Sequence, residues 1–249
     1  MKRLLDIAIS FFGLIVFLPI LVPVAILILL QDGHSPFYIA SRTGAGKKEF
    51  AMVKLRSMVV NADRSGVDST AASDPRITVL GRLIRRYKFD ELPQLWNVLV
   101  GEMSLVGPRP NIRREVTLYT AEERRLLSVR PGITDFASIV FADEGDILRD
   151  RPDPDVAYHQ LIRPWKSRLG LFYVDHLSVG LDLRLLGLTL LALASRRHAL
   201  NHVVSLLEER GADSELCRVA ARREPLKPCP PPGAIHIVTS RDNLVGAER

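Results

Sequence analysis

The hydrophobic positions of this chain follow two different patterns. An almost unbroken apolar run extends from Leu4 to Leu30, with Asp6 and Ser10 as its clearly polar residues. Later segments are amphipathic: the apolar residues from Leu92 to Val100 recur at i, i+3, i+4, i+7 and i+8, which predicts a helix with one buried stripe. We therefore expect an apolar N-terminal helix attached to a small, mostly helical α+β domain.

The same reading predicts the other elements of the domain. The alternation from Phe50 to Val60 indicates a strand with Lys54 and Arg56 on one face, and a short strand is expected at 37–40. Residues 61–75 are polar and are expected to be mobile. Helices are expected at 77–87, at 92–100 with Gly101 as its end, at 111–129, near 158–169 and at 179–194.

Two of the later segments differ from an ordinary core helix. The segment 179–194 is apolar but contains Asp182 and Arg184, which favours an amphipathic helix at a membrane interface over a membrane span. Beyond Ser195 we expect one modest helix followed by a proline-rich, loosely ordered tail. The predicted organisation is a membrane helix at 1–31, a catalytic domain at 32–194 and a partly disordered C-terminal extension at 195–249.

The N-terminal apolar run has three interpretations. A secretory signal is disfavoured, because the run is roughly twice the usual length of a signal's apolar region and lacks a small-residue cleavage site. A spanning helix is favoured by length, but Pro19 and Pro23 interrupt it and basic residues flank both sides. A re-entrant helix broken at Pro19 would keep both flanks on the cytoplasmic face. Composition alone leaves the last two interpretations open.

Composition and charge narrow the function classes. The net charge of +6 and pI near 9.6 suit nucleic acid, anionic lipid or a phosphate-rich substrate. Only 6% of residues are aromatic and no nucleic-acid module is recognisable, so nucleic acid is not expected as a partner. Cys217 and Cys229 fit a reducing compartment without a disulfide framework. No ligand spacing indicates zinc.

The adjacent acids Asp90 and Glu91 are the first candidates for chemistry. In one interpretation Asp90 caps the following helix and Glu91 is a first-turn carboxylate, with Pro93 tolerated in the first turn. In the other, a carboxylate among basic residues ligates a hard cation such as Mg²⁺ or attacks phosphorus to form an acyl-phosphate. Spacing alone does not choose between them.

Arg109 is the second candidate. It stands between Pro108 and Pro110, which stiffen the turn, and a fixed guanidinium suits bidentate binding of phosphate. A solvated surface turn is the simpler interpretation. Lys54, Arg56 and Arg85 could supply supporting charge, and Arg85 with Arg86 could equally hold anionic lipid headgroups.

Together these motifs resemble the bacterial sugar transferases, that is, monotopic polyprenyl-phosphate phosphoglycosyl transferases. The resemblance covers about residues 1–194. The matching residues are Lys2-Arg3-x-x-Asp6, Arg42-x-Gly44, Lys54-Leu55-Arg56-Ser57-Met58, the run Asp90-Glu91-Leu92-Pro93-Gln94-Leu95-Trp96-Asn97-Val98-Leu99, the run Met103-Ser104-Leu105-Val106-Gly107-Pro108-Arg109-Pro110, and Arg130-Pro131-Gly132-Ile133-Thr134.

The resemblance implies an enzyme with a re-entrant helix at the bacterial inner membrane and its catalytic domain on the cytoplasmic face. Asp90 would attack the β-phosphorus of a nucleoside diphosphate sugar, expel UMP and carry a covalent phosphosugar. Glu91 would then assist polyprenyl phosphate, in particular undecaprenyl phosphate, in attacking that intermediate. Mg²⁺ would bind at Asp90. Phosphate would be bound by residues of three motifs: Arg109 with Pro108 and Pro110, Lys54 with Arg56 and Arg85, and Arg130.

Several departures from the family pattern bear on these expectations. Glu102 and Leu18 stand where many members have Asp and Ser, and Asp135-Phe136 replaces the usual residues after Thr134, a change that could bear on sugar choice. Two other functions stay open beside the expected start of exopolysaccharide or glycoconjugate assembly. They are a membrane-anchored Mg²⁺-dependent phosphohydrolase and a non-catalytic assembly factor in which the acid pair only caps a helix. A homo-oligomer also stays open.

Overall fold

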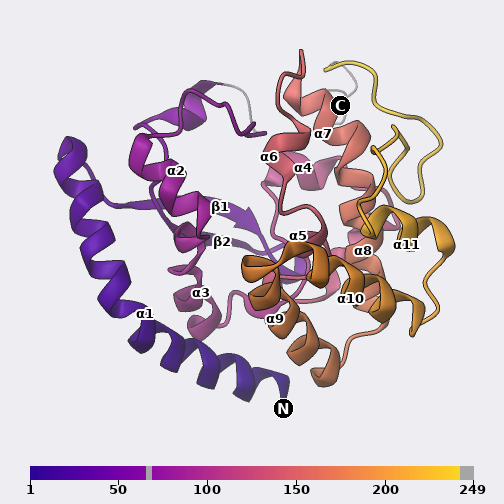
Figure 1. Cartoon of the computed structure of the whole chain (residues 1–249), viewed down its shortest axis with the longest axis horizontal. Helices are drawn as coiled ribbons and strands as arrows, with labels where there is room; N and C mark the ends of the chain where they lie inside the picture. The colour runs from indigo at the N-terminus through magenta and orange to yellow at the C-terminus, as the bar shows by residue number, and fades with distance from the viewer. Residues whose placement is uncertain (66–68, 242–249) are drawn as a thin grey trace.

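Figure 1 shows the computed structural model of the chain, which describes residues 1–65 and 69–241. The helices are α1 (Lys2–Asp32), α2 (Val79–Arg86), α3 (Gln94–Val100), α4 (Arg113–Thr117), α5 (Phe136–Val140), α6 (Glu144–Ile147), α7 (Pro154–Leu161), α8 (Arg163–Asp175), α9 (Val179–Ala194), α10 (Arg196–Glu208) and α11 (Ser214–Ala220). The strands are β1 (Phe37–Thr43), β2 (Glu49–Leu55), β3 (Ser104–Val106) and β4 (Gly132–Thr134). The expected mostly helical composition with little sheet is confirmed.

The strands form two small sheets. β1 and β2 pair antiparallel, with Phe37 opposite Leu55 and Ala40 opposite Met52. Ala40, Met52 and Leu55 are buried, so one face of this hairpin packs on the domain as the alternation predicts. β3 and β4 pair parallel in the order Ser104 to Gly132 and Val106 to Thr134. This second pair brings together two turns that are distant in the sequence.

Helix α1 runs along the outside of the domain and is largely exposed. It is the one described helix that is long and apolar enough to cross a membrane, by length and composition. The helix is continuous from Lys2 to Asp32 through Pro19 and Pro23, and Figure 1 shows it bending into two arms. Prolines lack an N–H and crowd the preceding turn, so the break expected at Pro19 takes the form of a bend within one helix.

Both ends of α1 are bound to the domain. At the start, Lys2 donates to Asp182 Oδ2 at 2.6 Å and to the Val106 carbonyl at 3.0 Å, while buried Asp6 accepts from Ser104 Oγ at 2.9 Å. At the end, Arg56 donates to both carboxylate oxygens of Asp32 at 2.6 Å. Lys2 and Asp6 at the start of α1 and Asp32 at its end are therefore held by the same folded body.

The prediction of one long helix at 111–129 is wrong, because the segment forms two short elements. α4 ends at Thr117, and a 3₁₀ turn, η4 (Glu123–Ser128), begins after a break. At the break Thr120 Oγ1 accepts from Glu123 N at 3.1 Å, and Glu123 Oε2 accepts from Thr120 N at 3.0 Å. This reciprocal capping box starts a new helical turn. The sequence signal for it is Thr120-x-x-Glu123.

The segment near 158–169 also differs from the single expected helix. α7 ends at Leu161 and α8 begins at Arg163. Pro164 in the first turn of α8 provides the physical reason, since proline has no N–H to continue the preceding helix but is tolerated at the start of a new one. The helices expected at 77–87, 92–100 and 179–194 correspond to α2, α3 and α9. Gly101 ends α3 with the left-handed φ of 93°.

The C-terminal region contains two helices rather than the one expected. α10 contributes an apolar stripe, Ala199, Leu200, Val203, Leu206 and Leu207, to the main core, and α11 contributes Leu216, Cys217 and Ala220. The core therefore runs across residue 195, while the proposed domain boundaries at 31 and 194 stay predictions. The last residues of the tail, 242–249, lie outside the described residues.

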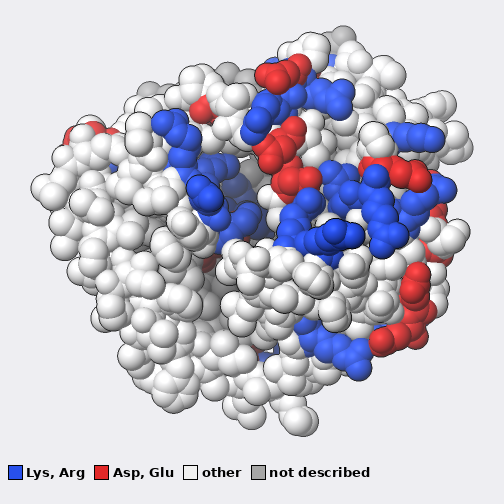
Figure 2. Space-filling view, in the orientation of Figure 1, with Lys and Arg blue, Asp and Glu red and all other residues white. Residues whose placement is uncertain are grey.

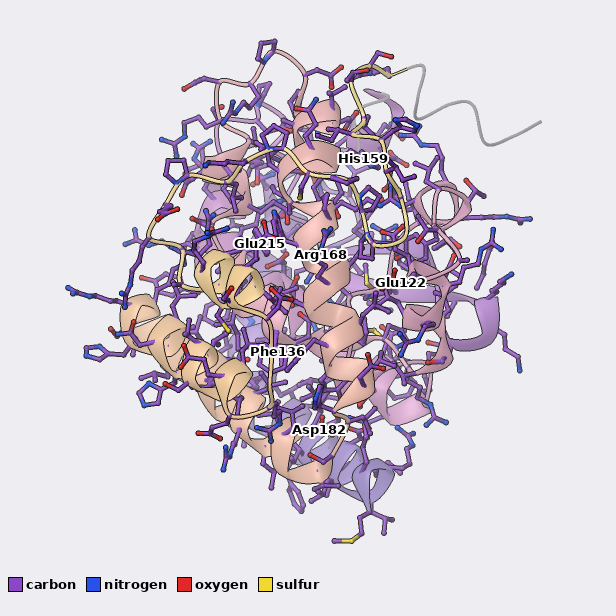
Figure 3. The ribbon with its side chains drawn as sticks, turned by 90° about the vertical axis from the view of Figure 1, so that its right-hand side faces the viewer. Glu122, Phe136, His159, Arg168, Asp182 and Glu215 are labelled. Atoms are coloured by element: carbon purple, nitrogen blue, oxygen red, sulfur yellow. The ribbon has the colours of Figure 1, made fainter. Side chains whose placement is uncertain are left out.

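The described part of the tail after α11 crosses the face of α8; Figure 3 labels Arg168 on α8 and Glu215 on α11. Arg168 donates to the Pro230 carbonyl at 3.1 Å, and Thr120 donates to the Pro232 carbonyl at 2.6 Å. Of the segment 61–75 that was expected to be mobile, residues 66–68 lie outside the described residues. The described Ser69 and Ala72 donate their N–H groups to Asp155 Oδ1 and to the Gly145 carbonyl, each at 2.9 Å.

Candidate active site

A hollow opens on the face shown in Figure 2, over the β1–β2 hairpin between α2 and α6, and basic side chains gather around it. Three separate pieces of chain bring the predicted residues to this region. Asp90 and Glu91 lie in a 3₁₀ turn, η3 (Phe89–Glu91), between α2 and α3. Lys54 lies near the end of β2, and Arg109 lies in the turn after β3.

The turn η3 gives the acid pair its position. Lys88 precedes it with a left-handed φ of 59°, a conformation that costs a non-glycine residue free energy and often marks a functional site. α3 begins after Pro93, and no side chain caps it. Asp90 is therefore not the N-cap of α3, and the interpretation in which the acid pair only caps this helix is wrong.

Asp90 is a buried carboxylate without a partner. Its relative exposure is 9%, and its Oδ1 accepts no hydrogen bond from any described residue. Burial, followed by the neighbouring Glu91, raises the pKa of Asp90 above its ordinary value, although Lys54, Arg85 and Lys88 act in the opposite direction. A buried, unsatisfied polar atom is costly. A bound cation or a reacting group would supply the partner that this oxygen lacks among the described residues.

Glu91 has the opposite environment. Its Oε1 is contacted by the guanidinium of Arg109 and lies 3.5 Å from Lys54 Nζ. Burial alone would raise the pKa of Glu91, but Arg109, Lys54 and Lys88 outweigh it and hold that pKa well below its usual range. The two adjacent acids thus differ in their protonation. Burial raises the pKa of Asp90, whereas Glu91 is held as an anion between two cations.

Lys54 is perturbed by the same cluster. Burial and the nearby charge of Arg109 lower the pKa of Lys54 to about 8, against the opposing effect of Glu91 and Asp90. Arg85 lies close enough for its charge to act on Asp90, and it donates to Ser57 Oγ at 3.5 Å. Of the predicted site residues, Asp90, Glu91, Lys54, Arg85 and Arg109 are therefore brought together.

The Pro108–Arg109–Pro110 turn is held by the second sheet. Gly132 donates its N–H to the Pro108 carbonyl at 3.0 Å, and Gly107 donates to the Thr134 carbonyl at 3.0 Å. The two chains approach so closely that a Cβ on Gly132 would lie 2.1 Å from the Gly107 nitrogen. Glycine at position 132 is thus required by the close approach that fixes Arg109.

Asn97 fixes Lys54 in a similar way. Its side chain accepts from Val53 N at 3.0 Å and donates to the Ala51 carbonyl at 2.8 Å, which ties β2 to α3. Asn97 also donates to Glu102 Oε2 at 2.7 Å. The departure at Glu102 therefore has a structural role, in which its carboxylate orients an asparagine that positions the strand carrying Lys54.

Two predicted phosphate-binding residues do not join the cluster. The guanidinium of Arg56 is bound to Asp32 at the end of α1. Arg130 donates its Nε to the Gly101 carbonyl at 2.9 Å, which lies at the end of α3 opposite the acid pair. In this structure they contact a helix end and a backbone carbonyl, and their binding of phosphate stays a prediction.

Three charged residues were missed by sequence reasoning. Lys88 is adjacent to the acid pair, and its charge lowers the pKa of Glu91 and Asp90. Glu144 of α6 and Lys166 of α8 contact each other, and Arg109 acts electrostatically on Glu144. Lys88 could have been found from its place beside Asp90. Nothing in the spacing of the other two indicates their position.

The departure at Asp135-Phe136 has structural partners as well. Asp135 caps α5 by accepting from Ser138 N at 2.7 Å, and Phe136 is 0% exposed. Both residues are buried, and Phe136 belongs to the main core.

Comparison with known proteins extends these observations. The family profile described as bacterial sugar transferase matches residues 1–196. An Aeromonas hydrophila protein named UDP-N-acetylgalactosamine-undecaprenyl-phosphate N-acetylgalactosaminephosphotransferase is 34% identical over 180 residues, which cover 69% of this chain and 42% of that protein.

Two further relatives are similar over comparable lengths. The UDP-glucose:undecaprenyl-phosphate glucose-1-phosphate transferase of Caulobacter vibrioides is 34% identical over 67% of this chain and 65% of its own length. The exopolysaccharide production protein PSS of Rhizobium leguminosarum bv. phaseoli is 37% identical over 75% of this chain and 91% of its own length. The chain thus spans less than two thirds of the first two relatives and most of the third.

Proposed function

The chain belongs to the bacterial sugar transferase family, and from this we propose that it transfers a sugar phosphate from a nucleoside diphosphate sugar to a polyprenyl phosphate. The observation that carries the proposal is the buried, unpartnered Oδ1 of Asp90 beside a carboxylate held by two cations. The names of the relatives support uridine as the nucleoside and undecaprenyl phosphate as the acceptor.

In the first step, the Asp90 carboxylate attacks the β-phosphorus of the donor. An acyl-phosphate bond forms, the phosphoanhydride bond breaks, and UMP leaves with the bonding electrons. Partial desolvation, which raises the pKa of Asp90, also makes its anion more reactive. Arg109, Lys54 and Lys88 supply positive charge around the phosphates, which is the main task of a protein in phosphoryl transfer.

In the second step, a phosphate oxygen of the polyprenyl phosphate attacks the phosphorus of the intermediate. The new phosphoanhydride bond forms as the acyl-phosphate bond breaks, and Asp90 is regenerated as a carboxylate. Glu91 assists by holding Arg109 and Lys54 against the two phosphates, since its lowered pKa makes it a weak base at neutral pH. One phosphoanhydride replaces another, so the exchange needs no ATP.

Magnesium suits this site. Mg²⁺ prefers oxygen ligands, usually one or two carboxylates together with substrate phosphates, and the free Oδ1 of Asp90 offers such a ligand. When bound there, Mg²⁺ would neutralise charge on the diphosphate. Glu91 is a poorer ligand because Arg109 and Lys54 already occupy its Oε1.

We also propose that α1 is a re-entrant helix and that the hollow faces the cytoplasm at the inner membrane. A straight span would place the two ends of α1 on opposite sides of a hydrocarbon core that is about 30 Å thick. Here Lys2 at one end and Asp32 at the other both contact the folded domain. This anchoring, together with basic residues on both flanks, favours a helix that enters and leaves on one side.

The proposal is tested by intact-protein mass spectrometry after incubation with Mg²⁺ and single UDP-sugars, without a lipid acceptor. A mass increase of one phosphosugar is expected for the wild-type chain and not for Asp90→Asn. Addition of undecaprenyl phosphate should discharge the adduct and yield a lipid-linked product. Lipid product formed by Asp90→Asn would contradict the mechanism, and release of free phosphosugar alone by the wild type would instead indicate a phosphohydrolase.

A further inference from the structure

The α6 wall of the hollow carries a polar group that the proposed chemistry does not use. It consists of Glu144 on α6 and Lys166 on α8, which form an ion pair, with the Lys166 ammonium 5.3 Å from the centroid of the Tyr158 ring. Their side chains are 31% and 19% exposed. Figure 2 shows acidic side chains over α6 at the edge of the hollow.

This wall shares its electrostatic environment with the acid pair. The charges of Arg109 and Lys88 act on Glu91 and also on Glu144. Burial alone would raise the pKa of Glu144, but Lys166, followed by Arg109 and Lys88, lowers it. Glu144 is therefore ionised at neutral pH. The two carboxylates lie around the same pair of cations, on different elements.

The backbone around Glu144 is fixed from two sides. Glu144 donates its N–H to the Phe141 carbonyl at 3.0 Å, and the next residue, Gly145, accepts from Ala72 N at 2.9 Å. A Cβ at Gly145 would lie 3.0 Å from that Ala72 nitrogen, so the segments pack closely. Lys166 contacts Oε2 of Glu144, and no described residue donates a hydrogen bond to its Oε1.

An ionised carboxylate accepts hydrogen bonds and donates none. It repels phosphate, so the cations of the cluster and Glu144 cannot serve the same part of a ligand. What Glu144 can bind is a group rich in O–H or N–H donors that is attached to the phosphate held by Arg109. In a nucleoside diphosphate sugar, the hexose is the group bonded directly to the phosphorus that Asp90 would attack.

We propose that Glu144, held in place by Lys166, is a specificity-determining residue that accepts hydrogen bonds from the hydroxyl or amide groups of the donor sugar. This inference rests on the proposed function for the identity of the donor. A fixed acceptor that pairs with a substrate hydroxyl discriminates against sugars that place that hydroxyl elsewhere, because the partly buried acceptor is then left without that hydrogen bond. Lys166 is a positioning residue, since it acts through Glu144.

The test compares Glu144→Gln with Asp146→Asn, a matched control on the same helix whose side chain is 62% exposed and paired to Arg149. Calorimetry on the full chain in nanodiscs would measure the affinity of UDP, UDP-glucose, UDP-galactose, UDP-N-acetylglucosamine and UDP-N-acetylgalactosamine. For Glu144→Gln we expect the affinity of the preferred UDP-sugar to fall about tenfold, as for loss of one charged hydrogen bond. UDP affinity should not change, which also shows that the variant is folded.

The control Asp146→Asn should bind every ligand as the wild type does. An equal loss for UDP and UDP-sugars in Glu144→Gln would assign Glu144 to the ribose or the phosphates and would overturn the inference. An unchanged affinity for every sugar would also overturn it, as would a wild type that binds UDP-sugars no better than UDP. Failure of the transferase proposal has a separate sign: no Asp90 adduct forms in the wild type, whatever the affinities.

Discussion

Lys54 Nζ lies 3.5 Å from the same Glu91 oxygen that the Arg109 guanidinium contacts. Two cations thus share one carboxylate oxygen at the edge of the hollow, and one of them can lose its proton near physiological pH. Arg109 stays charged at any pH at which the protein is folded. Lys54, with a pKa lowered to about 8, is the member of the pair that responds to pH.

The first prediction concerns this response. As pH rises through about 8, Lys54 becomes neutral, and the rate of adduct formation on Asp90 should fall. Lys54→Arg should retain activity above that pH, because arginine does not titrate there. The raised pKa of Asp90 should produce a second loss on the acidic side, so the rate profile should be bell-shaped. An alkaline limb that persists in Lys54→Arg would contradict the assignment.

Unfolding does not explain the expected alkaline loss. Between about pH 8, the value in the folded chain, and about 10.4, the ordinary value, the unfolded state binds more protons at Lys54 than the folded state does. By linkage, the contribution of Lys54 to the free energy of unfolding therefore increases with pH across that window. Thermal melts recorded at the same pH values separate the two effects.

The second prediction separates Arg56 from Lys54. Since Arg56 is bound to Asp32 at the end of α1, Arg56→Lys should leave the KM for the UDP-sugar within about twofold. Lys54→Met should weaken transition-state stabilisation by about 1.5–3 kcal/mol, the usual worth of a charged hydrogen bond, seen as a lower kcat/KM. Steady-state kinetics with a radiolabelled donor measure both. A large increase of KM in Arg56→Lys would show that Arg56 does take part in binding the donor.

The third prediction concerns the topology of α1. In a chain carrying Cys217→Ser and Cys229→Ser, single cysteines at position 4 (Leu4→Cys) and at position 35 (Ser35→Cys) should react with a membrane-impermeant maleimide from the same side. Labelling is expected in inside-out vesicles and not in intact spheroplasts. Both positions are exposed at opposite ends of the helix. Labelling of the two from opposite sides would show a span and refute the re-entrant helix.

The fourth prediction tests the close approach that holds Arg109. Gly132→Ala places a Cβ 2.1 Å from the Gly107 nitrogen, so the two turns must separate. Overpacking of this kind costs about 1–3 kcal/mol, and a lower melting temperature should accompany loss of donor binding. Gly180→Ala is the control, because nothing lies within 4 Å of its Cβ and it is helical. If Gly132→Ala bound the donor with unaltered affinity, the contact between Gly132 and Gly107 would not be needed to position Arg109.

The fifth prediction concerns the C-terminal helices. Leu207 on α10 is 0% exposed in the main core, so Leu207→Ala should lower the free energy of unfolding by about 2–5 kcal/mol. Ile235 in the tail is 88% exposed, and Ile235→Ala should change the free energy of unfolding by less than about 0.5 kcal/mol. Chemical denaturation in nanodiscs measures both. Equal effects would mean that α10 is not part of the stable core.

The sequence predicted those elements whose apolar stripe is uninterrupted. α2, α3 and α9 begin and end within about two residues of expectation, because helical periodicity defines them and, for α3, Gly101 marks the end. The gathering of Asp90, Glu91 and Arg109 was also predicted, although from family motifs rather than from spacing. No local pattern indicates that the turn after β3 meets the turn before α3.

The errors have physical causes that can be located. Arg56 was expected beside Lys54 because alternate strand residues share a face, but β2 ends at Leu55, and the alternation ends with it. The helix predicted at 111–129 was too long because the prediction did not take the capping box of Thr120 and Glu123 as the start of a new helical turn. Glu144 and Lys166 lie 22 residues apart and meet only in the folded chain, which sequence periodicity does not encode.

The anchoring of α1 has a consequence for how the protein is made. The contact between Lys2 and Asp182 joins positions 180 residues apart. Arg3 and Asp6 form hydrogen bonds with groups between residues 98 and 105. During translation α1 leaves the ribosome long before those partners exist. The contact between Lys2 and Asp182 can therefore form only after most of the domain has been synthesised, so the start of α1 is fixed completely only late in folding.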